Sequence, residues 1–301
     1  MRKFWIGMSS ILLLVVASWI GNLWYYQAHQ LGKTVFLEHH LEVRMVPGEI
    51  FDLYYLEDLH AEKKVSGIII QDHPDMRVQA HTPDYRRYSH QVLGRFMLSV
   101  SPDYMVSEKE DSADEPSVIQ SVIVQYHDGT TKEMDIGEIR LIKESTNEGD
   151  SPLNWSSGGS SSDLTGFSTL QIERPIELID IKSHYLNLIG NGQLQFYINI
   201  ITNPPGSSFQ MRTSEENLIA LEGVPFHELI LPQKMQKRDS IRFSYKYVPG
   251  EAMQMDIYQL RIQLEMTEAE HIWKEALLIY ATPSFSEAAV RDFVKEKRRQ
   301  P

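Results

Sequence analysis

Hydrophobic and polar positions alternate with a period of two along most of the chain after its first thirty residues. Side chains of a β-strand point alternately to opposite faces, so this period predicts strands with one buried face. The clearest cases in the first half are residues 49–56, 65–71, 118–126 and 132–142. Asp128-Gly129, between the last two, is typical of a hairpin turn. Short strands separated by turns predict a β-sandwich or barrel.

The second half continues the β pattern and changes character only at its end. Its expected strands are residues 170–173, 177–181, 185–189, 194–201, 241–247, 253–266 and 272–281. Residues 85–100 fit either a strand pair or a short helix, because their apolar positions match both periods.

Residues 122–141 and 243–262 resemble each other at a constant offset of 121 positions. The matching positions are Val122, Val124 and Tyr126 with Phe243, Tyr245 and Tyr247; Gly129 with Gly250; Met134, Asp135 and Ile136 with Met255, Asp256 and Ile257; and Ile139, Arg140 and Leu141 with Leu260, Arg261 and Ile262. Each stretch fits a strand, a turn and a strand, so we expect one β unit used twice. Finding both stretches in one shared sheet would contradict two separate domains.

A polar stretch rich in Gly, Ser and Asp separates the two similar regions and favours an interdomain linker. We predict a cytoplasmic stub and membrane anchor at 1–32, a first β-sandwich domain at 33–145, a flexible linker at 146–165 and a second β-sandwich domain at 166–301. A long loop inside one domain is the alternative. Another polar, acidic tract at 107–116 interrupts the first domain.

The chain ends in a pattern of helical period. Ser284 and Glu287 fit a capping box, and basic residues near the end complement the helix dipole. The expected apolar stripe is Ala289, Val290, Phe293 and Val294. We expect this short helix to pack on the second sandwich; docking of its basic tail onto a membrane or an acidic wall polymer is the alternative.

The N-terminus predicts a membrane anchor. Residues 4–26 carry no charge, and a helix of that length rises ~35 Å, enough to cross a hydrocarbon core of ~30 Å. Aromatic residues mark both ends of the span: Phe4 and Trp5 at one end, and Trp24, Tyr25 and Tyr26 at the other. Arg2 and Lys3 place the N-terminus in the cytoplasm by the positive-inside rule. A cleavable signal peptide that ends near Ala17 is the alternative.

Composition narrows the classes of function. The chain has no cysteine, which excludes disulfides, thiolate catalysis and cysteine–zinc sites. The formal net charge of -12 argues against a broad basic face for nucleic acid, so we expect no nucleic-acid partner.

Histidines and acidic residues cluster early in the chain and are the only candidates for metal ligands. Six of the eleven histidines lie between positions 39 and 90, and the candidates are His39, His73 and His81. Their spacing matches no compact ligand signature, so we predict solvated or hydrogen-bonded histidines, with no metal and no cofactor. The acidic tract 108–115 lacks the pattern of a calcium-binding loop and is expected to be a charged loop.

The sequence contains no motif that indicates a particular reaction. The chain lacks the G-x-S-x-G elbow, the P-loop and the dinucleotide-binding glycine fingerprint. Four tyrosines could stack against sugar rings, and a strand should bury one of its neighbouring pair Tyr54 and Tyr55; the other two are Tyr85 and Tyr88.

These observations predict a mostly β protein: an N-terminal transmembrane helix, two tandem β-sandwich domains and a short C-terminal helix. We expect a membrane-anchored, extracytoplasmic, non-enzymatic binding or adaptor module for an envelope protein partner. The alternative is a cell-surface protein that binds or processes carbohydrate. A row of exposed aromatic residues over a groove with two carboxylates would favour this alternative.

Overall fold

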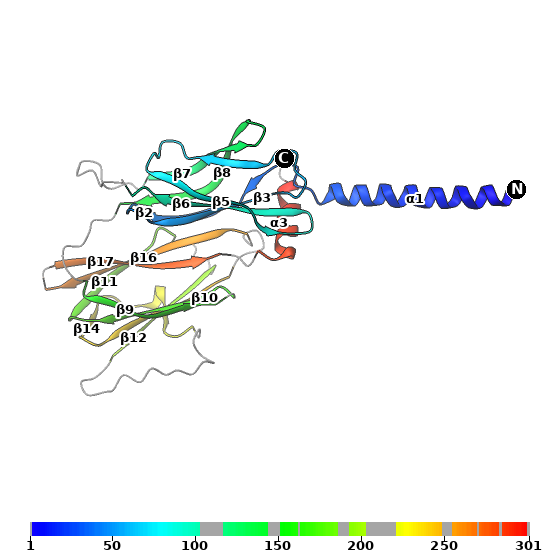
Figure 1. The fold of residues 1–301 in the computed structure, drawn as a ribbon. Helices are drawn as coiled ribbons and strands as arrows, with labels where there is room; N and C mark the ends of the chain where they lie inside the picture. The colour runs from blue at the N-terminus through cyan, green and yellow to red at the C-terminus, as the bar shows by residue number, and fades with distance from the viewer. Residues whose placement is uncertain are drawn as a thin grey trace.

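The structure is a computed structural model that describes residues 2–102, 117–143, 151–161, 163–185, 193–202, 221–248, 255–269, 271–282 and 285–299, with only the backbone of residues 2–11. The described part of the chain is mostly β, as predicted, and forms three sheets with a helix near each end (Figure 1). The acidic tract 108–115, Ser284 and most of the residues 185–189 lie outside the described residues.

The first sheet has four strands in the order β1-β3-β6-β5. Their bounds are Val35–Phe36 for β1, Ile50–Asp58 for β3, Gln91–Val100 for β6 and Met76–Arg87 for β5. All neighbours are antiparallel. Residues 85–100 therefore belong to a strand pair, which was one of the two expectations.

The central sheet runs β14-β11-β16-β2-β8-β7-β4, and β17 pairs with β16 beside this path. The bounds are Gln233–Met235 (β14), Ile176–Lys182 (β11), Ile257–Glu268 (β16), His39–Arg44 (β2), Thr131–Ile142 (β8), Ser117–Tyr126 (β7), Val65–Ile69 (β4) and His271–Ala281 (β17). Strand β2 pairs in parallel with both β8 and β16. It thereby joins strands from the two halves of the chain into one sheet.

The third sheet runs β13-β12-β15-β10-β9. The bounds are Val224–Pro225 (β13), Leu194–Ile201 (β12), Ser240–Tyr247 (β15), Thr165–Ile172 (β10) and Leu153–Ser160 (β9). A single 3₁₀ turn, Phe226–Glu228, follows β13. Strand β9 lies within the predicted linker, so for residues 153–160 that prediction is wrong. The glycines of this stretch have a packing role, because the Phe167 ring lies against Gly159.

Two hydrophobic cores fill the space between the sheets. The first sheet packs on the β4-β7-β8-β2 part of the central sheet around residues such as Tyr55, Phe96 and Ile136. The third sheet packs on the β16-β11-β14-β17 part around residues such as Phe243 and Leu264. We call these units the first and second sandwich. They have separate cores and a continuous central sheet.

The two similar stretches of sequence occupy different places in these sandwiches. Strands β7 and β8 form an antiparallel hairpin within the central sheet, with the turn at Asp128-Gly129 as predicted. Their sequence counterparts separate: β15 lies in the third sheet and β16 in the central sheet. Strands β8 and β16 thus share one sheet, with β2 between them, which argues against fully separate domains.

Helix α1, Arg2–Ala28, projects from the first sandwich as a single rod (Figure 1). Among the residues that the structure describes, no helix is both long enough and apolar enough to cross a membrane. The predicted helix is therefore present over residues 4–26, but this finding does not support the prediction that it spans a membrane.

Helix α3, Glu287–Arg299, forms where the C-terminal pattern predicted it. Its cap is Ser286, whose Oγ accepts a hydrogen bond from the N–H of Ala289 at 3.2 Å. Its buried residues Val290, Phe293 and Val294 join the core of the first sandwich. Packing on the second sandwich was therefore a wrong expectation: the stripe was correct, but sequence pattern does not say which core a helix reaches.

Candidate functional site

A groove of about 380 Å³ lies between the edges of the second sandwich, where β9 of the third sheet faces β17 of the central sheet. Its walls combine apolar side chains with two hydroxyls and one carboxylate: Ser151, Leu153, Trp155, Ser168, Leu170, Glu275, Ala276, Leu277 and Leu278. In the described part of the chain, β9 pairs only with β10 and β17 only with β16. Both strands therefore present an open backbone edge beside the groove.

Trp155 is the most exposed large side chain of this groove, with 63% of its surface accessible. The pairing of β9 with β10 shifts register opposite Thr169 and Leu170, which leaves Ser156 as a bulged residue whose Oγ donates to the Thr169 carbonyl at 3.1 Å. The indole lies against Gly158, where a Cβ would sit 3.2 Å from its Cζ2. The bulge and the glycine together let a large ring lie on a strand edge without being buried.

His39, a metal candidate, is instead a core residue. Its side chain is fully buried, Nδ1 donates to the Ile136 carbonyl at 3.0 Å, and Nε2 accepts from the Tyr54 N–H at 2.9 Å. It thus links β3 of the first sheet to β8 of the central sheet. Burial lowers the pKa of His39 from 6.5 to about 4, so the ring is neutral at pH 7.

The other two metal candidates lie elsewhere and do not join His39. His81 on β5 stacks on Phe96 with ring centroids 4.1 Å apart and shares a 2.7 Å hydrogen bond with the Tyr55 hydroxyl. His73 is half-buried in the turn between β4 and β5. Burial lowers the pKa of both imidazoles. Over the described residues, no three His, Asp or Glu side chains gather as metal ligands would.

The tyrosines proposed as a sugar platform are mostly core residues. Tyr54, Tyr55 and Tyr88 are buried, whereas Tyr85 is 43% exposed and packs under Arg95 and edge-on to Tyr54. Both members of the neighbouring pair are buried, one more than strand alternation predicts. Tyr55 fills the first core, while Tyr54 packs against Phe285 just before α3.

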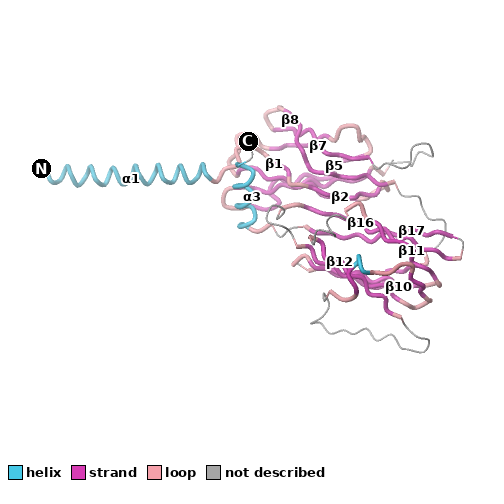
Figure 2. The backbone as a smooth tube through the Cα atoms, turned by 180° about the vertical axis from the view of Figure 1, so that it is seen from behind, coloured by secondary structure: helices cyan, strands magenta, loops and turns pink. Residues whose placement is uncertain are grey.

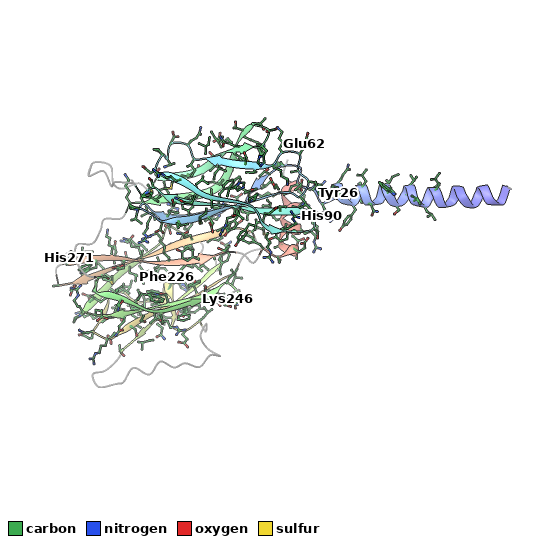
Figure 3. All side chains as sticks on the ribbon, in the orientation of Figure 1. Tyr26, Glu62, His90, Phe226, Lys246 and His271 are labelled. Carbon is green, nitrogen blue, oxygen red and sulfur yellow. The ribbon has the colours of Figure 1, made fainter. Side chains whose placement is uncertain are left out.

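The aromatic residues predicted to mark the anchor meet different surroundings. Phe4 and Trp5 lie in α1, where only the backbone is described. Trp24 is 75% exposed. Tyr25 and Tyr26 lie at the end of α1 next to the body, with ring centroids 5.9 and 5.8 Å from that of His90 (Figure 3).

A buried polar pair at the seam of the sandwiches was missed by sequence reasoning. The Glu42 carboxylate on β2 accepts a hydrogen bond from the Arg261 N–H on β16 at 2.6 Å, beyond the point where the two backbones pair. Burial raises the pKa of Glu42 and lowers that of Arg261. The pair completes the β2–β16 ladder, so we assign it to the fold rather than to a ligand. Its partners are distant in sequence, and no local signal indicates it.

Comparisons with known proteins add little. No protein-family model and no curated protein matches the chain. One similar solved structure is a protein of unknown function from Porphyromonas gingivalis W83, 7% identical with a TM-score of 0.25, covering 82% of this chain and 99% of that one. Another is that of fibronectin(III)-like modules of Clostridium thermocellum CbhA, 6% identical with a TM-score of 0.20, covering 84% of this chain and 95% of that one. Similarity this low carries no argument.

Proposed function

We propose that this chain is a membrane-anchored, extracytoplasmic binding module without enzymatic activity, and that it holds an extended segment of an envelope protein partner in the groove between β9 and β17. One observation carries the proposal: two open strand edges flank an apolar groove with an exposed indole. An unpaired edge offers backbone N–H and C=O groups that an extended peptide can pair with. Trp155 and Leu278 then supply apolar contact.

The exposed surface of α1 is the observation that favours the proposed anchor. Its apolar side chains lie open along the described length, from Leu12 at 65% exposed to Trp24 at 75%. Such a surface is unfavourable in water and favourable in a bilayer. Arg2 and Lys3, at the N-terminal end of α1 ahead of its uncharged stretch, favour a body outside the cytoplasm by the positive-inside rule. N-terminal sequencing of the protein in the membrane fraction tests the anchor; a mature start near Ser18 would show a cleaved signal peptide instead.

The partner site is tested by capturing partners from detergent-solubilised membranes with the full chain and two variants. Trp155→Ala removes the exposed indole, and we expect it to lose the specific partner. Tyr280→Ala is the matched control, because this aromatic residue is 55% exposed on β17 but does not line the groove. Circular dichroism should show that both variants stay folded. Equal recovery of partner by Trp155→Ala and Tyr280→Ala would contradict the proposal.

Carbohydrate binding is the second candidate, and one observation favours it. The Glu275 carboxylate and the Ser151 and Ser168 hydroxyls line the same groove as the Trp155 indole. The described lining holds one aromatic residue and one carboxylate. A carbohydrate site was expected to show a row of exposed aromatic residues and two carboxylates. Saturable quenching of Trp fluorescence by a wall polysaccharide, lost in both Trp155→Ala and Glu275→Gln, would favour carbohydrate over a peptide.

A further inference from the structure

The end of the body from which α1 leaves is formed partly by helix α3. Figures 1 and 2 both show α3 running across the direction of α1, beside the point where α1 meets the first sandwich. The β5–β6 turn holds α3 in this place: the Tyr88 hydroxyl donates to the Phe285 carbonyl at 2.7 Å, and the Ser89 N–H donates to Glu287 at 3.2 Å.

The junction between α1 and the body is fixed by hydrogen bonds. Asp58 is buried at the end of β3, and its carboxylate accepts the N–H of Leu31 at 2.8 Å and that of Gly32 at 2.7 Å. Gln91 donates to the same carboxylate at 3.1 Å and to the His29 carbonyl at 2.6 Å. The segment after α1 is therefore pinned to both β3 and β6, and the body keeps one orientation relative to the helix.

The last turn of α3 lies at the end of α1. Arg298 donates to the carbonyl of Gln27 at 3.1 Å and to that of Ala28, two carbonyls of the last turn of the helix. Residue 28 is two positions beyond Tyr26, where the predicted span ends, a rise of about 3 Å. The headgroup layer is about 5–8 Å thick. If α1 spans the bilayer, Arg298 therefore lies at headgroup depth.

The charge of α3 suits this position. Its apolar side is buried in the first core, and the exposed side carries Arg291, Lys295, Arg298 and Arg299. The acidic residues of the helix are fewer, and Asp292 lies between two of the cations, 3.2 Å from Lys295 and 3.9 Å from Arg291. Residues 295–299 include four basic side chains and one acidic one, in a chain whose net charge is -12.

We propose that the exposed basic side of α3 lies on anionic phospholipid headgroups of the membrane that holds α1. The proposal rests on the anchor of the proposed function and adds a lipid class and a second contact surface to it. The acidic remainder of the chain is repelled by an anionic bilayer, so this face is the one that the charges favour. Because the junction is fixed, contact of α3 with lipid also holds the sandwiches in one orientation above the membrane.

The test uses the full chain, which has no cysteine, with a single cysteine introduced for a fluorescent label. Ala288→Cys reports on α3, and Ile230→Cys, at a side chain 79% exposed in the second sandwich, is the control site. Each is reconstituted in vesicles of phosphatidylcholine with or without phosphatidylglycerol, containing nitroxide-headgroup lipid. We expect strong quenching at 288 that increases with phosphatidylglycerol, and little at 230.

Charge removal then tests the lipid class. Arg291→Gln with Lys295→Gln should lower the ratio of docked to undocked body by up to about 25-fold, since each cation near an anionic surface is worth about fivefold and Asp292 offsets part of their charge. Lys234→Gln with Lys237→Gln, two exposed lysines of the second sandwich, should change nothing.

Three results would overturn the inference. Equal quenching at 288 and 230 in a chain that resists carbonate extraction would refute the lipid contact and leave the anchor intact. Quenching at position 288 that is the same with and without phosphatidylglycerol, or the same in the charge variants and the wild type, would refute recognition of anionic lipid. Extraction of the chain by carbonate would refute both the anchor and the inference.

Discussion

The protonation of His39 tests how the first sheet packs on the central sheet. Its Nε2 accepts the Tyr54 N–H and its Nδ1 donates to the Ile136 carbonyl, so only the neutral ring with its proton on Nδ1 satisfies both bonds. The perturbation is a decrease of pH from 7 to 4, applied to the wild-type chain and to His39→Gln. Protonation of the buried ring would place two donors against each other at Tyr54 and an unpaired charge in the core.

The magnitude follows from the pKa of His39, which burial lowers from 6.5 to about 4. Above pH 6.5 the ring is neutral in both folded and unfolded chains, and its full contribution to stability is present. As pH falls from 6.5 to 4, the unfolded chain takes up a proton that the folded chain does not. The free energy of unfolding therefore decreases, by about 3 kcal/mol in total.

The assay is denaturant unfolding of the full chain in detergent at several pH values, followed by Trp fluorescence. Burial raises the pKa of Asp256 to about 6, and this carboxyl acts in the opposite direction over the same range. The informative quantity is therefore the stability gap between wild type and His39→Gln. At pH 7 we expect a gap of about 1–3 kcal/mol, because glutamine leaves one buried backbone group unpaired.

Towards pH 4 the wild type should lose about 3 kcal/mol relative to His39→Gln, because only the wild type carries the imidazole that must stay neutral, so the gap should close or change sign. His60→Gln is the control: His60 is exposed in the turn after β3, and its gap should stay flat. A His39→Gln gap that is constant between pH 7 and pH 4 would refute the description of His39 as a neutral, doubly bonded core residue.

Three further predictions concern packing and are checked by thermal or denaturant unfolding. Gly137→Ala should destabilise by at least about 3 kcal/mol, because φ is +89° and a Cβ would lie 2.4 Å from the backbone of β2; Gly129→Ala, at φ +80° with open space around it, should cost about 1 kcal/mol, and equal losses would contradict the clash. Gly94→Ala should destabilise by about 2–3 kcal/mol, because a Cβ would lie 2.1 Å from a buried tyrosine ring; an unchanged midpoint would contradict this packing. Tyr88→Phe should cost about 1 kcal/mol and raise amide exchange in α3, since it removes the bond to the Phe285 carbonyl; unchanged exchange would show that this bond does not hold the helix.

Local sequence pattern predicted strands such as β7 and β8 because these strands carry their own signal. Alternation over residues 118–126 and 132–142 follows directly from burial of one face, and Asp128-Gly129 supplies the turn that joins them. The helical stripe of α3 is equally local. These features need no information from distant parts of the chain.

The Ser/Gly-rich stretch was misread because its order depends on partners outside it. In isolation, residues 156–161 favour a flexible linker. In the fold residues 156–160 belong to an edge strand, and the glycines leave room for the rings of Trp155 and Phe167. The groove was missed for the same reason, since its walls come from β9, β10 and β17. The tryptophan beside this Ser/Gly-rich stretch was the one local feature that could have indicated the groove.

The parallel ladders of β2 were also beyond local pattern. His39 pairs with Gly137 on one side and with Ile257 on the other. A strand with parallel neighbours is not joined to them by a short hairpin turn, so no local sequence signal indicates which strands it pairs with. Its pairing depends on which faces the two cores bury. The histidines are close in sequence, yet over the described residues they do not gather as metal ligands would.

A correspondence between the two sandwiches appears in tertiary packing rather than in the offset-121 similarity. In the first sheet, Tyr55 of β3 lies across Gly94 of β6, and in the third sheet Tyr245 of β15 lies across Gly166 of β10. Each pair leaves a buried ring over a glycine on the neighbouring antiparallel strand.

The order of these pairs differs between the halves. The tyrosine strand precedes the glycine strand in the first sheet and follows it in the third. The sequence similarity instead matches β7 of the central sheet with β15 of the third. Shared alternation of buried and exposed positions therefore accounts for that similarity. The Tyr–Gly pairs show that both sandwiches pack a tyrosine ring over a glycine in the same way, although the two strands come in a different order along the chain.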